Sequence, residues 1–269
     1  MVSACLGAQP AYKWSKTEAL ADTLLNRNQV FDAIKLYTRV IRLQQKQKFT
    51  GKSVVRFKRA LCYYYTASFN EAIADLNIFI AENPEYPRAR LLRAYVYREL
   101  NEPEKQLQDL TVVLDDDPYN VDLAKWYASI LLEVENAGEA LRMLQALQLM
   151  FNDEEVETNL GIAYYYLNNP DSALHHFNEA IFINGGYFPA YRHAALLCQE
   201  QQQYLQSLEY LNLALLLDPD NPELLMYAGI ALAETGHRDK ACNYLNRAFY
   251  AGFAKAKNHL ERYCYQADD

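Results

Sequence analysis

The chain has 269 residues with 26 basic and 34 acidic side chains, a formal net charge of −8 at pH 7, and 51% hydrophobic residues. This composition suits one soluble, elongated α-helical domain, and no stretch approaches the roughly 20 apolar residues of a membrane span. The acidic balance and the lack of a base-reading motif argue against nucleic acid as a partner.

Residues 1–13 precede the first periodic pattern, and we expect them to form a flexible N-terminal segment. Within them, Val2-Ser3-Ala4-Cys5 resembles the end of a bacterial lipoprotein signal, although the apolar run that should precede it is absent. Two interpretations stay open. Either the match is chance and the chain is cytoplasmic as written, or Cys5 is lipidated and the chain faces the periplasm.

From residue 14 onward, one pattern repeats about every 34 residues. A small residue marks the first half of each repeat: Ala21, Ala60, Ala94, Ala128, Gly161, Ala195 and Gly229. A second series runs twelve residues behind it, with Gln106 as its one large member: Ala33, Ala72, Gln106, Ala140, Ala173, Ser207 and Ala241. Each period holds two amphipathic stretches around a short turn. The pattern therefore predicts helical hairpins whose two helices cross closely at the small residues.

Turn residues mark the joints. Pro84, Pro118 and Pro219 follow the second stretch of their repeats, where proline ends a helix. Gly236 lies just past the first stretch of the last repeat, where a left-handed cap is expected. Two places depart from the pattern: about five extra residues fall within 44–52, and the turn near Gly138 is off the usual spacing.

These features resemble the tetratricopeptide repeat family over about 14–255, most fully in Leu160-Gly161, Tyr164, Ala173, Phe177 and Ala180. The closing repeat resembles those of many bacterial members, which favours a bacterial source. The resemblance implies an all-α, right-handed superhelical solenoid with a capping helix at 254–266. We expect about seven helix–turn–helix repeats, at 14–52, 53–86, 87–120, 121–153, 154–187, 188–221 and 222–255.

Charge is divided unevenly: residues 1–105 carry 17 basic and 10 acidic side chains, whereas 106–269 carry 9 and 24. Nine basic residues and no acidic one lie between Lys35 and Arg59. This basic end is either a solvated surface or a docking surface for an acidic partner, for membrane headgroups or, least favoured, for nucleic acid. Head-to-tail self-association is a further alternative.

Repeats two and three place arginine where the family usually has apolar packing residues, namely Arg56, Arg59, Arg90 and Arg93. The same two repeats have Asp75 and Asp109 at the matching position of the second helix. Two interpretations follow. The aspartates neutralise partly buried arginines in an internal ladder of ion pairs, or the arginines form an anion-binding strip for a partner.

No catalytic or metal-binding constellation is present, since the chain lacks a Gly-rich phosphate loop, GxSxG and HExxH. We therefore expect no enzymatic activity, no cofactor and no metal, with an enzyme of unrecognised type as the weakest alternative. The five cysteines have no metal spacing, but Cys242 and Cys264 could approach each other at the cap and form a disulfide.

The resemblance implies that first helices line a concave groove that holds an extended peptide or a helix. It places these side chains in the groove: Phe57, Leu61, Tyr64, Leu91, Tyr95, Arg98, Lys125, Ser129, Leu132, Thr158, Ile162, Tyr165, Arg192, Leu196, Gln199, Met226, Ile230 and Ala233. We therefore predict a non-catalytic scaffold for a protein or peptide, with acidic ligands favoured toward the N-terminal half. The alternative is a lipid-anchored bacterial envelope protein that joins a membrane or secretion assembly, and membrane contact is expected only if Cys5 is lipidated.

Overall fold

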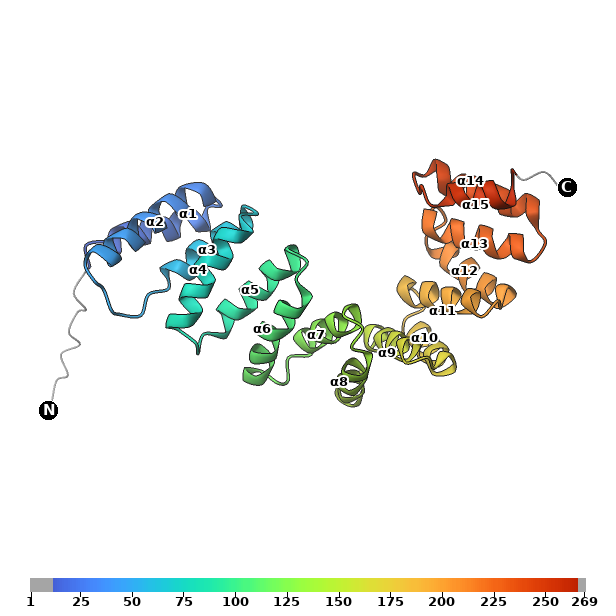
Figure 1. The fold of residues 1–269 in the computed structure, drawn as a ribbon, viewed down its shortest axis with the longest axis horizontal. Helices are drawn as coiled ribbons and strands as arrows, with labels where there is room; N and C mark the ends of the chain where they lie inside the picture. Colours follow the sequence, from blue (N-terminus) through green and yellow to red (C-terminus); the bar gives the residue numbers. More distant parts are fainter. Residues whose placement is uncertain (1–11, 266–269) are drawn as a thin grey trace. The chain divides into compact units, whose positions relative to one another are not determined.

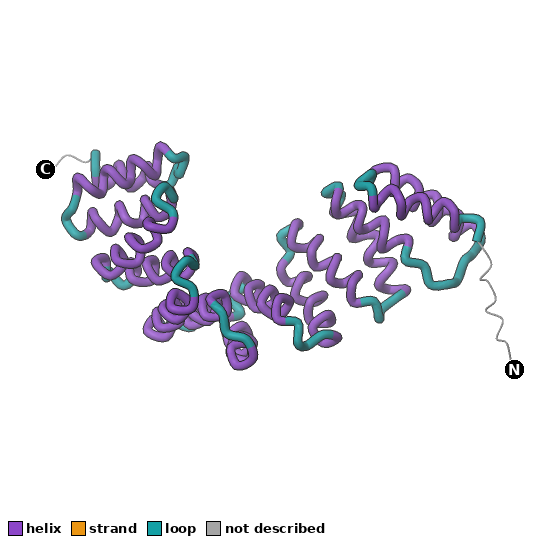
Figure 2. Tube along the Cα trace, turned by 180° about the vertical axis from the view of Figure 1, so that it is seen from behind, coloured by secondary structure: helices purple, strands orange, loops and turns teal. Residues whose placement is uncertain are grey.

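The structure, a computed structural model, describes residues 12–265. This part of the chain consists of helices joined by loops and turns (Figure 2). Its fifteen helices form seven hairpins and one additional helix, which confirms the predicted all-α repeat fold.

In chain order the hairpins are α1 (Ser15–Asn26) with α2 (Val30–Lys46), α3 (Val55–Tyr65) with α4 (Phe69–Glu82), α5 (Pro87–Glu99) with α6 (Pro103–Asp116), α7 (Val121–Glu133) with α8 (Ala137–Met150), α9 (Glu154–Tyr166) with α10 (Pro170–Ile183), α11 (Phe188–Glu200) with α12 (Tyr204–Leu217), and α13 (Pro222–Glu234) with α14 (Arg238–Tyr250). The additional helix is α15 (Ala256–Tyr263), which lies inside the predicted capping segment.

The chain divides into two compact units, one up to Asn120 and one from Val121 onward. Unit 1 holds the hairpins from α1 to α6, and unit 2 those from α7 to α14 together with α15 (Figure 1). Within each unit, a second helix packs on its own first helix and on the first helix of the next hairpin. First helices of neighbouring hairpins also contact each other, as α3 does with α5 and α9 with α11, so they form the inner face of each stack.

The small residues lie where the two helices of a hairpin cross. All seven members of each series are buried, and Gln106 is the one large side chain among them. At Gly161, an added Cβ would lie 2.4 Å from the ring of Phe177, and at Gly229 it would lie 2.7 Å from Leu245. Contacts below 3 Å force a neighbour to move, so the predicted close crossing is confirmed.

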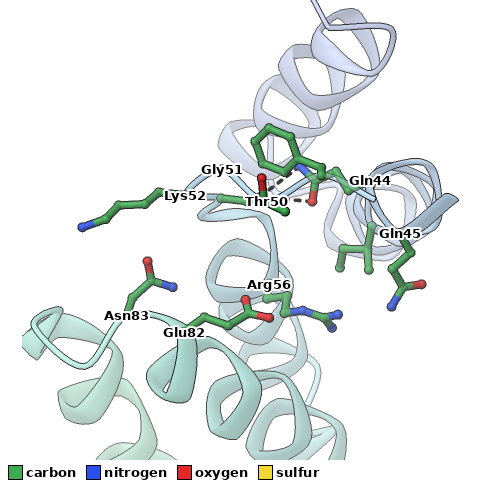
Figure 3. Close-up of a pocket in the computed structure, with 11 residues that line it drawn as sticks. Gln44, Gln45, Thr50, Gly51, Lys52, Arg56, Glu82 and Asn83 are labelled. Atoms are coloured by element: carbon green, nitrogen blue, oxygen red, sulfur yellow. Dashed lines mark hydrogen bonds between the residues drawn. The ribbon is translucent and has the colours of Figure 1, made fainter. Parts of the chain in front are cut away.

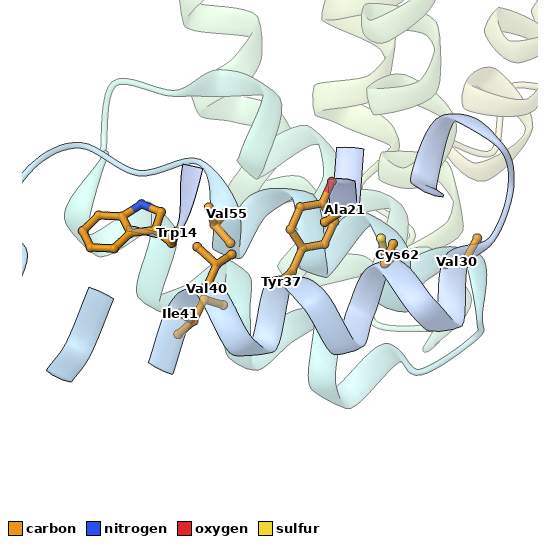
Figure 4. Packing of buried hydrophobic residues seen from close by; sticks show 9 residues of the cluster. Trp14, Ala21, Val30, Tyr37, Val40, Ile41, Val55 and Cys62 are labelled. Carbon is orange, nitrogen blue, oxygen red and sulfur yellow. The ribbon is translucent and has the colours of Figure 1, made fainter. Parts of the chain in front are cut away.

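The first hairpin of unit 1 closes on a core that includes Trp14, Tyr37, Val40 and Val55 (Figure 4). Tyr37 is fully buried, and its hydroxyl donates a hydrogen bond to Asp22 at 2.6 Å. Because the hydroxyl has this partner, the ring can be buried without stranding a polar group. The loop after α2 joins the same core, since the ring of Phe49 meets that of Trp14 edge to face at 5.2 Å.

Every hairpin turn uses a left-handed residue two positions after the first helix. The residues with positive φ there are Asn28, Ala67, Asn101, Glu135, Asn168, Gln202 and Gly236. The expected left-handed cap at Gly236 is confirmed. The predicted displacement of the turn in the fourth repeat is wrong, because Glu135 takes the usual left-handed position and Gly138 lies inside α8.

A disulfide joins Cys242 of α14 to Cys264, with 5.8 Å between the two Cα atoms. It fastens the end of α15 to the last hairpin, whose apolar face Leu260 helps to cover. Cys62 and Cys198 are free and buried.

A non-glycine residue at positive φ is strained, whereas glycine is not. We expect Glu135→Gly to raise the free energy of unfolding of unit 2 by about 0.5 kcal/mol, after allowing for the extra entropy of glycine in the unfolded chain. Gly236→Ala should lower it by about 1 kcal/mol. Urea unfolding followed by circular dichroism measures both, and equal effects of the same sign would contradict the explanation.

Candidate functional site

The inner face of unit 1 contains a pocket of about 270 Å³ between α3 and α5. All six groove residues predicted for this unit line it: Phe57, Leu61 and Tyr64 from α3, and Leu91, Tyr95 and Arg98 from α5. Apolar side chains backed by the core of the second hairpin provide most of the lining, and Phe57 packs edge to face on Tyr86 at 5.3 Å. The structure therefore brings these six residues together.

The pocket also has members that sequence reasoning missed: Tyr65, Arg88 and Leu92. Arg88 and Arg98 are exposed, and the guanidinium carbon of Arg98 lies 5.3 Å from the centre of the Tyr95 ring. The repeat spacing contains a signal for Arg88, because it lies one helical turn before Leu91 on the same helix. The result is an apolar hollow with two cationic side chains beside it.

Unit 2 has an inner-face pocket of about 210 Å³ between α9 and α11. The predicted residues Ile162, Tyr165 and Leu196 line it, together with His193 and Glu200. The hydroxyl of Tyr165 donates a hydrogen bond to Glu200 at 3.0 Å. Burial, followed by the charge of Arg192, lowers the pKa of His193 to about 4. The imidazole is therefore neutral near pH 7.

Five other predicted groove residues are buried or hydrogen-bonded within unit 2. Lys125 is only 7% exposed and forms ion pairs with Asp153 and, at 3.2 Å, with Glu155. Ser129 donates its hydroxyl hydrogen to the carbonyl of Trp126 at 2.8 Å, and Thr158 is buried. Leu132 and Met226 are buried as well, with 5% and 3% of their surface exposed.

Arg192 and Gln199, two further predicted residues, connect neighbouring first helices. Arg192 pairs with Glu223 of α13 at 3.4 Å, and Gln199 donates a hydrogen bond to the carbonyl of Tyr227 at 2.9 Å. Both contacts hold α11 to α13 on the inner face. A ligand that engages these two side chains has to replace contacts that the folded unit already makes.

The four arginines of repeats two and three form internal ion pairs. Arg59 holds Asp75 with two hydrogen bonds of 2.6 and 2.7 Å, and Arg93 holds Asp109 at 2.7 and 2.6 Å. Arg56 and Arg90 approach the same carboxylates at 3.5 Å. Asp75 and Asp109 are 3% and 2% exposed. The internal ladder is therefore confirmed for both repeats.

In repeat five, the repeat position of Arg56 holds an acidic residue and the repeat position of Asp75 holds a histidine. Glu157 of α9, which is 1% exposed, lies 2.7 Å from Nδ1 of His176 of α10. Burial raises the pKa of Glu157, but hydrogen bonds from His176, Gln148 and Asn152 outweigh this and hold it below its usual value. The charge-bearing positions of the repeat are thus kept while the residue types change.

The loop between α2 and α3 encloses a polar pocket of about 360 Å³ (Figure 3). Its lining includes Gln44, Lys52, Arg56, Glu82 and Asn83. The amide of Gln44 and the hydroxyl of Ser53 hydrogen-bond to each other at 3.0 Å. The extra residues at 44–52 form much of its wall, so the insertion in the first repeat is the sequence signal for this pocket.

Other predicted features concern metal, membrane and lipid. Within residues 12–265, no group of three His, Cys, Asp or Glu side chains could hold a metal ion. In the same range, no helix is both long and apolar enough to span a bilayer. Cys5 lies outside the described residues, so its lipidation stays a prediction.

Comparison with known proteins gives consistent results. The sequence model described as "Tetratricopeptide repeat" matches residues 57–121. Human tetratricopeptide repeat protein 6 is 24% identical over 203 residues, which cover 76% of this chain and 39% of that protein. The chain thus spans less than half the length of this curated relative.

Solved structures show the same fold. A tetratricopeptide repeat protein from Parabacteroides merdae has a TM-score of 0.67 at 13% identity, covering 92% of this chain and 97% of its own. YrrB, described as a repeat protein with an unusual peptide-binding site, has a TM-score of 0.50 at 20% identity, covering 69% and 97%.

The buried ladder predicts a loss of stability when its carboxylates are neutralised. Asp75→Asn and Asp109→Asn each leave buried arginine charge without its counter-ion, which should cost about 3 kcal/mol of unfolding free energy. Glu85→Gln is the matched control, because its ion pair with Lys52 is exposed. Melting temperatures measure the effect, and unchanged stability in the Asp variants would contradict an internal role.

The low pKa of His193 predicts acid sensitivity of unit 2. The unfolded imidazole has a pKa near 6.5, so as the pH falls toward 4 the unfolded chain binds the proton more tightly than the folded one. This group should remove on the order of 3 kcal/mol of stability between about pH 7 and pH 4. His193→Gln should flatten that part of the profile, whereas exposed His175→Gln should not.

A Trp14→Phe background lets the fluorescence of Trp126 report on unit 2 alone, because the chain has two tryptophans. Urea unfolding at a series of pH values then measures the profile. Parallel profiles for the His193 variant and its control would rule out this imidazole as the cause.

Proposed function

Because this chain is a tetratricopeptide repeat protein, we propose that it is a non-catalytic scaffold that binds a protein segment on the inner face of its helical hairpins. The single observation that carries the proposal is the pocket between α3 and α5, which gathers every groove residue predicted for unit 1. The fold of the chain is one that commonly serves in protein–protein interaction, and YrrB, a solved neighbour, is described as having a peptide-binding site.

The unit 1 pocket suits an apolar side chain of the ligand. Phe57, Leu61 and Leu91 offer carbon surface inside a hollow of about 270 Å³, which is near the lower size limit of pockets that bind small groups. Burying one large apolar side chain there contributes roughly 1.5–3 kcal/mol. Tyr64 and Tyr95 add contact area with polar tips, which is typical of residues that dominate binding energy.

The charges next to the pocket favour an acidic segment. Arg88 and Arg98 are exposed at opposite ends of α5, and Arg98 also pairs with exposed Glu99 at 3.4 Å. Arg59 and Arg93, by contrast, are held by buried aspartates. An arginine can hold a carboxylate with two parallel hydrogen bonds. A ligand with one apolar anchor and nearby Asp or Glu residues therefore fits unit 1, and the acidic side chains would speed association at low salt.

The test is capture of partners from the source organism by the tagged full chain, followed by mass spectrometry. Tyr64→Ala with Tyr95→Ala removes the aromatic contacts in unit 1, and Tyr165→Ala tests unit 2 separately. Arg88→Glu with Arg98→Glu reverses the two charges. Lys35→Glu is the matched control, because Lys35 is exposed on α2, away from the inner face.

We expect the unit 1 variants to lose at least tenfold in affinity for the captured protein, and the Lys35 variant to bind like the native chain. Circular dichroism verifies that each variant is folded. Equal recovery of the same partners by the native chain and by all inner-face variants would contradict the proposal. Loss with the tyrosine variant but not with the charge reversal would show that the ligand is apolar and not acidic.

A further inference from the structure

The second helices of unit 2 present large apolar side chains to solvent at one fixed position. The thirteenth residues of α8, α10, α12 and α14 are Leu149, Phe182, Leu216 and Tyr250, with exposed fractions of 89%, 87%, 78% and 83%. The residues that follow the first three are also apolar and at least 40% exposed: Met150, Ile183 and Leu217. We call these seven side chains the apolar row. Single exposed apolar residues are ordinary, but a series at the same position of four successive hairpins is not.

The repeat fold does not require this row. In unit 1, the thirteenth residues of α2, α4 and α6 are Arg42, Ala81 and Asp115. The same hairpins are therefore built with a basic, a small or an acidic residue at that position. The apolar row has to be explained by what covers it, because the packing of the hairpins leaves it exposed.

Charged side chains are absent from the row and from the position four residues before it. The ninth residues of the same helices are all amides: Gln145, Asn178, Asn212 and Asn246. Residues 121–269 carry 20 acidic and 9 basic side chains, so an uncharged strip on this unit stands out. Depletion of charge next to exposed apolar groups is typical of the core of a protein–protein contact.

We propose that the apolar row is the contact between two copies of this chain, related by a two-fold axis. A symmetric contact brings a surface against a copy of itself. On a unit with excess negative charge, acidic residues in such a contact would repel each other, whereas apolar groups attract and amides can both donate to and accept from their copies. The apolar row and the four amides beside it therefore have the composition that a self-facing surface needs. The proposal concerns the second helices and is independent of the inner-face site.

The area is sufficient for a dimer. Seven side chains at these exposed fractions, each offering on the order of 100 Å², present up to roughly 700 Å² of apolar surface. A stable contact of standard size buries about 800 Å² per partner, a little over half of it apolar. When it is covered in full, the row therefore supplies the apolar part of such a contact.

Sedimentation velocity of the full chain from about 1 to about 100 μM tests the proposal, because contacts of this size dissociate over ranges that include these concentrations. The native chain should form dimers. Phe182→Glu combined with Leu216→Glu should raise the dimer dissociation constant at least tenfold. The matched control places the same two glutamates in unit 1, as Ile78→Glu with Ala81→Glu on exposed positions of α4, and should dimerise like the native chain.

Circular dichroism shows whether the variants are folded, which is expected because Phe182 and Leu216 are mostly exposed. A native chain that is monomeric throughout the range overturns the proposal, and so does a unit 2 variant that dimerises as tightly as the native chain. A monomeric native chain that sediments with phosphatidylcholine vesicles, and loses this with the unit 2 variant, would assign the row to lipid and would also overturn it.

Discussion

The close crossing of two helices within each hairpin is the constraint on which the rest of the structure depends. Where Gly161 faces Phe177, even one added carbon would come within 2.4 Å of the ring. Close approach at this point lets larger side chains above and below interdigitate, and it sets the distance between the layers of first and second helices. The inner face, the outer face and the turns between them all take their positions from this one contact.

Among residues 12–265, each buried charged side chain pairs with a basic or acidic side chain of a neighbouring helix or loop. Asp75 and Asp109 each receive two short hydrogen bonds from one arginine, and Glu157 receives one from His176. A buried charge without such a partner would cost several kcal/mol, so the ion pairs specify which hairpin neighbours are compatible. They also separate the arginines of unit 1 into two groups. Those near the aspartates are internal, whereas Arg88 and Arg98 remain at the surface beside an apolar pocket.

The two units use the same hairpin for different surfaces. Unit 1 has an inner-face pocket with cationic neighbours and a mixed outer face, on which Arg42 and Asp115 occupy the position of the apolar row. Unit 2 has a smaller inner pocket, several inner side chains engaged within the fold, and an outer face with large exposed apolar groups. In a repeat protein each hairpin contacts mainly its neighbours, so exposed positions can vary from repeat to repeat without altering the core.

The sequence by itself determined the repeat, the hairpins and the small residues at the crossings. These features depend on contacts within one period or between adjacent helices, which repeat spacing reveals. The sequence also located the unit 1 pocket, because the same three repeat positions on α3 and α5 line it. It left the pairing of Arg59 and Arg93 with aspartates as one of two alternatives, and the tertiary structure decided between them. Only the tertiary structure decided that Lys125 and Thr158 are interior, that the fourth turn centres on Glu135, and that Leu149, Phe182, Leu216 and Tyr250 are exposed together. The physical reason is that an apolar or charged side chain at a given period suits both a packed and an exposed site, and its neighbours from other helices decide which one it occupies.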